Sequence, residues 1–123
     1  MAGRQFVFDL PHDAALTRAD FVAAPANREA LGWIERWPDW PGAALSLYGP
    51  AGAGKTHLAQ IWRARSFAAE IAPEIIGNAA LPGLLRDARA VLIDGADRAA
   101  EEALLHLYNM LAERGGHLLL VSR

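Results

Sequence analysis

The chain has 123 residues, which is enough for one domain with a modest hydrophobic core. It contains no cysteine, which excludes disulfides and thiolate metal sites, and its net charge of −2 gives no overall attraction to nucleic acid. The sequence holds no apolar run close to the ~20 residues of a membrane-spanning helix, and it does not start with a signal-peptide pattern. We therefore expect a cytoplasmic protein that makes no contact with the membrane.

Residues 1–25 are expected to be irregular or extended, and they include one short apolar segment. In residues 5–10 a glutamine and a leucine flank alternating apolar positions, and Pro11 ends the segment. Two interpretations stay open, because such a segment can dock as an extended peptide on a partner or pack as a strand on the chain's own core. The side chains concerned are Gln5, Phe6, Phe8 and Leu10.

Residues 26–123 are predicted to form one α/β domain, because helical and strand patterns alternate along them. Such alternation is typical of a parallel sheet covered by helices on both faces, with ligands bound at the carboxyl ends of the strands. We expect helices over 26–37, 56–64 and 99–114, and buried strands over 43–48, 90–94 and 117–121. Residues 67–89 are harder to interpret: a short strand over 71–76, broken by a proline, and a helical turn over 81–86 both fit.

The segment between the first predicted strand and its helix matches the phosphate-binding pattern G-x-x-x-x-G-K-[ST]. The matching residues are Gly49, Pro50, Ala51, Gly52, Ala53, Gly54, Lys55 and Thr56. Lys55 is the one lysine among twelve basic residues, so an ammonium is used only where a P-loop requires it. His57 follows directly and joins the candidate nucleotide site, although an interface or core position fits this histidine as well.

A second half of the site is predicted at the end of the strand over 90–94. Asp94 ends this apolar run, as the metal-side acid of a P-loop protein does, and with Thr56 it would hold Mg²⁺. A strand-end aspartate that only caps a turn is the alternative. Many hydrolysing P-loop proteins carry a second acid at the next position, which here is Gly95. Nucleotide binding is therefore predicted, whereas Asp94 is the only catalytic candidate and hydrolysis by the chain itself stays open.

Several short motifs together resemble the AAA+ domain of the replication initiator DnaA and of the related Hda regulators. They are Gly54-Lys55-Thr56-His57-Leu58, Leu105-His106-Leu107-Tyr108-Asn109, Phe21-Val22 and Asn27-Arg28. The resemblance covers almost the whole chain and implies a P-loop NTPase core of AAA+ type that binds ATP or ADP with Mg²⁺. It also implies that Ser122 stands at the sensor 1 position, which reads the γ-phosphate. A fifth strand, an arginine finger and the lid subdomain would come after Arg123 and are expected to be missing.

The resemblance implies a role in the control of replication initiation. Hda-type proteins dock on the β sliding clamp of DNA polymerase III through a glutamine-and-leucine motif similar to residues 5–10, and promote hydrolysis of the ATP held by DnaA. The sequence has no counterpart of the DNA-binding domain of DnaA, so direct sequence-specific DNA binding is not expected. The alternatives are a stand-alone ATPase of helicase-loader type and a truncated remnant without activity.

Overall fold

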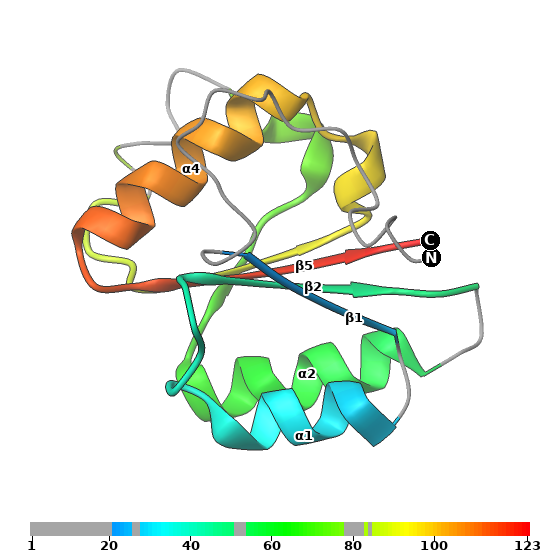
Figure 1. Ribbon diagram of the computed structural model, residues 1–123. Coiled ribbons are helices and arrows are strands. Elements are labelled where there is room, and N and C mark those ends of the chain that lie inside the picture. The colour runs from blue at the N-terminus through cyan, green and yellow to red at the C-terminus, as the bar shows by residue number, and fades with distance from the viewer. Residues whose placement is uncertain (1–20, 26–27, 51–53, 78–82, 84) are drawn as a thin grey trace.

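The computed structural model describes residues 21–25, 28–50, 54–77, 83 and 85–123 (Figure 1). Within them, short apolar runs form a single all-parallel sheet of five strands in the order β1-β2-β5-β4-β3. The strands are β1 (Phe21–Pro25), β2 (Ala44–Tyr48), β3 (Ala69–Glu70), β4 (Ala90–Asp94) and β5 (His117–Ser122). The helices are α1 (Arg28–Arg36), α2 (Lys55–Ser66) and α4 (Glu101–Glu113), with 3₁₀ turns η2 (Pro73–Ile75) and η3 (Ala96–Arg98).

The sheet lies between two helical layers, with α1 and α2 on one face and α4 on the other (Figure 1). Successive side chains of the central strands point to opposite faces, so each strand supplies both cores. One core joins Leu45, Leu47, Leu92, Leu119 and Val121 to Ile34 of α1 and Trp62 of α2. The other joins Val91, Ile93, Leu118 and Leu120 to Leu104, Leu107 and Leu111 of α4. The predicted three-layer α/β arrangement with a parallel sheet is therefore confirmed.

The strand β1 shows which form part of the N-terminal segment takes. Of residues 1–25, which were expected to be irregular or extended, residues 21–25 are extended and pair in parallel with all five residues of β2, from Phe21 beside Ala44 to Pro25 beside Tyr48. The strand β1 thereby forms one edge of the five-stranded sheet. The segment is short and rich in alanine, so its strand conformation depends on pairing with β2 rather than on its own pattern.

The segment between α2 and β4 corrects one prediction. No strand spans 71–76: the strand at this edge is the two-residue β3, paired with Val91 and Leu92 of β4. Pro73 begins the turn η2 instead of interrupting a strand, since proline lacks the N–H that a sheet needs. Half of the helical turn expected over 81–86, namely residues 81, 82 and 84, lies outside the described residues. None of the helices in the described ranges is long and apolar enough to cross a membrane.

The helices α1 and α2 are fixed to each other by one arginine and an aromatic cluster. The guanidinium of Arg65 donates hydrogen bonds to the main-chain oxygens of Ile34, Glu35 and Trp37, at 3.2, 3.0 and 3.0 Å, where α1 ends. The ring of Trp62 stacks on Trp40 at 5.8 Å between centroids. These contacts hold α2 against the sheet, which fixes the position of its N-terminal end at the candidate site.

Candidate functional site

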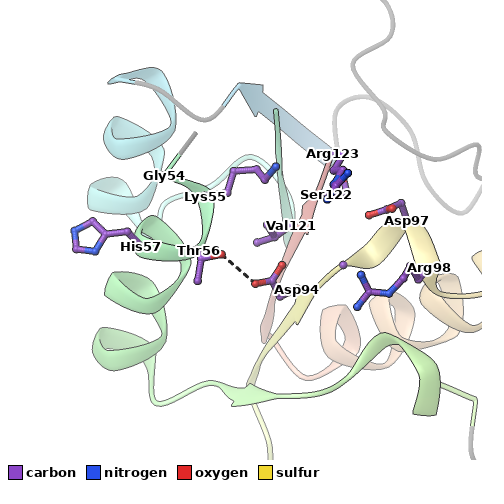
Figure 2. Close-up of a pocket in the computed structure, with 11 residues that line it drawn as sticks. Gly54, Lys55, Thr56, His57, Asp94, Asp97, Arg98, Val121, Ser122 and Arg123 are labelled. Atoms are coloured by element: carbon purple, nitrogen blue, oxygen red, sulfur yellow. Dashed lines mark hydrogen bonds between the residues drawn. The ribbon is translucent and has the colours of Figure 1, made fainter. Parts of the chain in front are cut away.

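A cavity of about 540 Å³ lies at the carboxyl ends of β4 and β5, opposite the first turn of α2 (Figure 2). Three segments line it. They are the start of α2 over 54–57, the end of β5 over 121–123, and the turn after β4 with Asp94, Gly95, Asp97 and Arg98. The location agrees with the general rule that ligands of parallel α/β sheets bind beyond the carboxyl ends of the strands.

The first turn of α2 has the features of an anion-binding helix N-terminus. Gly54 precedes the helix with a φ of 88°, a left-handed conformation that favours glycine, and no side chain caps the helix. The first-turn N–H groups of a helix have no partner within the helix, and they carry the positive end of its dipole. This end of the twelve-residue α2 lies on the wall of the cavity.

The ammonium of Lys55 is almost buried, with 9% of the residue exposed. It donates hydrogen bonds to the main-chain oxygens of Gly49 and Pro50, the latter at 3.2 Å. Within the described part of the chain no carboxylate forms an ion pair with it. A buried cation that has only neutral acceptors is costly, and an anionic ligand would compensate its charge.

Beside this lysine, the side-chain oxygens of Thr56 and Asp94 lie close together. The hydroxyl of Thr56 donates a hydrogen bond of 3.3 Å to Oδ2 of Asp94, which ends β4 (Figure 2). The described residues contain no cluster of three or more metal-binding His, Cys, Asp or Glu side chains, so within them the metal ligands offered at this point are incomplete. A hydroxyl and a carboxylate that leave the other positions to phosphates and water suit Mg²⁺.

Ser122 lines the same cavity and has an unpaired polar atom. The residue is 2% exposed, and its Oγ has no hydrogen-bond partner. Buried hydroxyls without a partner are rare, since the lost hydration is not replaced. Ser46 in β2 has a similarly buried, unpaired Oγ, but it does not line the cavity.

The turn after β4 contains an arrangement that the sequence motif does not reveal. Gly95 has a φ of 90°, and a Cβ placed on it would lie 2.6–2.8 Å from the guanidinium of Arg98. The Nε of Arg98 is 3.0 Å from Oε2 of Glu74 in η2. An arginine four positions after a strand-end aspartate gave no signal of its own in the sequence, because its place depends on the left-handed glycine and the turn η3.

The structure brings most of the predicted nucleotide-binding residues to one cavity. Gly54, Lys55, Thr56, His57, Asp94 and Ser122 line it, and Gly49 and Pro50 contact the lysine. The imidazole of His57 points outward from the rim (Figure 2). Ala51, Gly52 and Ala53 of the loop, and Gln5, Phe6, Phe8 and Leu10 of the proposed docking peptide, lie outside the described residues.

No protein-family model matches the chain, and the searches of curated proteins and of solved structures give no match either. The resemblance to DnaA-type domains therefore rests on the sequence motifs alone.

Proposed function

We propose that this chain is a P-loop domain that binds ATP or ADP together with Mg²⁺. The observation that carries the proposal is the Thr56–Asp94 hydrogen bond of 3.3 Å, formed in the same cavity as the buried ammonium of Lys55. A cation without a carboxylate partner and an incomplete set of metal ligands both call for the same kind of ligand, a polyphosphate that brings its own metal ion.

Each group on the cavity wall has a role in this proposal. Lys55 would exchange its main-chain acceptors for phosphate oxygens, and the first-turn N–H groups of α2 would donate to the same phosphates. Thr56 and Asp94 would hold Mg²⁺, which neutralises phosphate charge when bound. The unpaired hydroxyl of Ser122 would donate to the terminal phosphate.

The biological role that we propose follows the sequence resemblance to DnaA and Hda. In this role the nucleotide-loaded domain regulates the initiation of replication: residues 5–10 dock on the β sliding clamp, and the domain promotes hydrolysis of the ATP held by DnaA. Hydrolysis by the chain itself is not part of the proposal, because Gly95 stands where many P-loop ATPases have a second acid.

Nucleotide binding is tested by calorimetric titration and thermal unfolding with Mg-ADP and Mg-ATP. The wild type should bind both, and the bound state should gain about 2.7 kcal/mol at a ligand concentration of one hundred times Kd. Lys55→Ala should lose this gain. Arg63→Ala is the matched control, since Arg63 is an exposed cation of the same helix, 3.8 Å from Glu70. Equal binding by Lys55→Ala and the wild type would refute the proposed P-loop site.

The replication role needs a separate experiment, a binding assay with a bacterial sliding clamp in excess Mg-ADP. We expect the wild type to bind and the Gln5→Ala/Leu10→Ala double variant not to bind. If neither protein binds the clamp while both bind nucleotide, the role in replication control is wrong and the nucleotide site stands. Turnover of ATP by the wild type that disappears in Lys55→Ala would favour the stand-alone ATPase instead.

A further inference from the structure

We infer that Arg98 makes this site prefer a nucleoside triphosphate over a diphosphate, by binding the terminal phosphate from the position next to Asp94. The inference rests on the proposed nucleotide site and adds to it a residue that determines specificity. It starts from the place of the guanidinium, which lies where a side chain of residue 95 would begin.

The guanidinium of Arg98 lies close to the proposed metal-side acid, Asp94. The three outer atoms of Arg98 lie 2.6–2.8 Å from the point where a Cβ of Gly95 would be. Gly95 directly follows Asp94, and consecutive Cα atoms are about 3.8 Å apart. The guanidinium therefore lies beside the backbone at the residue next to Asp94. Arg98 lines the same cavity as Lys55, Thr56 and Ser122, and in Figure 2 its side chain extends toward Asp94.

The ion pair with Glu74 sets the orientation of the Arg98 guanidinium. Its Nε pairs with Glu74 at 3.0 Å, and within the described part of the chain Arg98 forms no ion pair with Asp94 or Asp97. A guanidinium has five N–H donors in a planar fork, so a partner at Nε leaves the two terminal NH₂ groups for a second anion. Those are the nitrogens beside Gly95. Glu74 is therefore a positioning residue that turns the fork toward the cavity.

A guanidinium beside residue 95 has different chemistry from an acid at that position. In many hydrolysing P-loop proteins the position of Gly95 carries an acid beside the terminal phosphate, and an acid there orients water. A guanidinium stays charged and cannot accept a proton, but it binds phosphate oxygens in a bidentate manner. With Arg98 beside residue 95, this part of the cavity would bind the terminal phosphate of a triphosphate, instead of orienting the attacking water. The side chain of Arg98 is 59% exposed, so it can adjust to a ligand.

The cavity has a second arginine that gives a matched control. Arg123 also lines the wall, directly after Ser122, and it is exposed. Arg98 differs from it by its ion pair with Glu74 and by its place beside Gly95. If general positive charge sets the preference, removal of either arginine should have the same effect. If the position of the fork sets it, only Arg98 should matter.

The test compares the affinities for Mg-ADP and for the magnesium complex of a non-hydrolysable ATP analogue with an imido bridge, both by calorimetry. We expect the wild type to bind the analogue more tightly than ADP. Arg98→Ala should weaken analogue binding about tenfold, as expected for a charge-assisted contact, and should change ADP affinity less than twofold. Arg98→Lys should retain part of the preference, and Glu74→Gln should lower it without removing it, since only the orientation of the fork is lost.

The outcomes separate this inference from the proposed function. If the wild type binds ADP in a manner that depends on Lys55, but shows no preference for the analogue or keeps it in Arg98→Ala, the inference about Arg98 is wrong and the nucleotide site stands. Loss of the preference in Arg123→Ala, with Arg98→Ala unchanged, also overturns it. If the wild type binds neither ligand, the proposed function and this inference both fail. Thermal unfolding of each variant checks that the protein is folded.

Discussion

The hydroxyl of Thr56 lies 3.3 Å from Oδ2 of Asp94, although the two residues are 38 positions apart in the sequence. The strand that precedes Thr56, β2, is separated from β4 by one strand, β5. The contact therefore spans a strand that itself ends in Ser122, and all three residues line the same cavity. This hydrogen bond thus links the first turn of α2 to the end of β4, across the strand that carries the buried serine.

Asp94→Asn should weaken nucleotide binding chiefly in the presence of Mg²⁺. The substitution keeps the size of the side chain but removes the charge that a hard cation prefers, so the gain in affinity on adding Mg²⁺ should fall about tenfold. The measurement is the Kd for ADP with Mg²⁺ and with EDTA. Asp97→Asn is the control, since Asp97 lines the same wall but has no hydrogen bond to Thr56. An equal effect of both variants would contradict the assignment of the metal-side acid.

Ser122→Ala and Ser46→Ala should have similar effects on the free protein and different effects on its ligand response. Both remove a buried hydroxyl without a partner, so neither should lower the unfolding free energy by more than about 0.5 kcal/mol. Only Ser122 lines the cavity. The rise in Tm caused by Mg-ATP should therefore shrink in Ser122→Ala and persist in Ser46→Ala. A smaller rise in both variants would show that Ser122 has no specific contact with the ligand.

Gly95→Ala should destabilise the protein mainly through its backbone. A residue with a side chain at a φ of 90° costs about 1–2 kcal/mol. The new methyl group also meets the guanidinium of Arg98, but this is the free end of an exposed side chain, so its displacement should add little. In urea unfolding we therefore expect the double variant Gly95→Ala/Arg98→Ala to lose about the sum of the two single effects. A double variant clearly more stable than Gly95→Ala would show that the guanidinium is held rigidly against Gly95.

The stability of the protein should fall as the pH drops below the ordinary pKa of histidine. Burial lowers the pKa of His117, and this effect outweighs a hydrogen bond with the backbone at Pro38, which raises it. The imidazole packs edge-on against Trp37 and Trp40, at 5.8 and 5.4 Å between ring centroids. The unfolded chain therefore binds the proton more readily, so stability is complete above a pH of about 6.5 and declines through the interval down to the lowered pKa.

The measurement for His117 is Tm between neutral pH and the onset of carboxyl titration, compared with His117→Asn. The variant should show a flatter profile in this interval. Glu74 does not interfere: hydrogen bonds with its own backbone and with Arg98 lower the pKa of Glu74, so its contribution is lost only at more acidic pH. Identical profiles for wild type and variant would place the pH response elsewhere in the chain.

The strands that could be predicted from the sequence are β2, β4 and β5, which consist largely of consecutive apolar residues. The strand over 90–94 has the predicted bounds, and β2 and β5 differ from theirs by one residue. Their apolar runs are buried on both faces, which is a property of the run itself. The edge strands β1 and β3 were missed because they owe their conformation to hydrogen bonds with β2 and β4, and a local pattern does not contain that information.

The same distinction holds for the site. Lys55, Thr56, Asp94 and Ser122 could be predicted because they stand at the junctions between strands and the segments that follow them, and parallel strands bring those junctions together. Arg98 could not, since its place beside Gly95 depends on a left-handed φ and on the 3₁₀ turn η3. A motif records residue types and their spacing, whereas this contact depends on the path of the backbone.

The order of the strands also determines when the cavity can exist during protein synthesis. The strand β5, over residues 117–122, is the middle strand of the sheet and pairs with both β2 and β4. Until a ribosome has released residue 122, β2 and β4 have no common neighbour, and neither the Thr56–Asp94 contact nor the buried Ser122 can form. The proposed nucleotide site is therefore complete only after the central strand has been made, and we expect a nascent chain that carries residues 49–56 without β5 not to take up nucleotide.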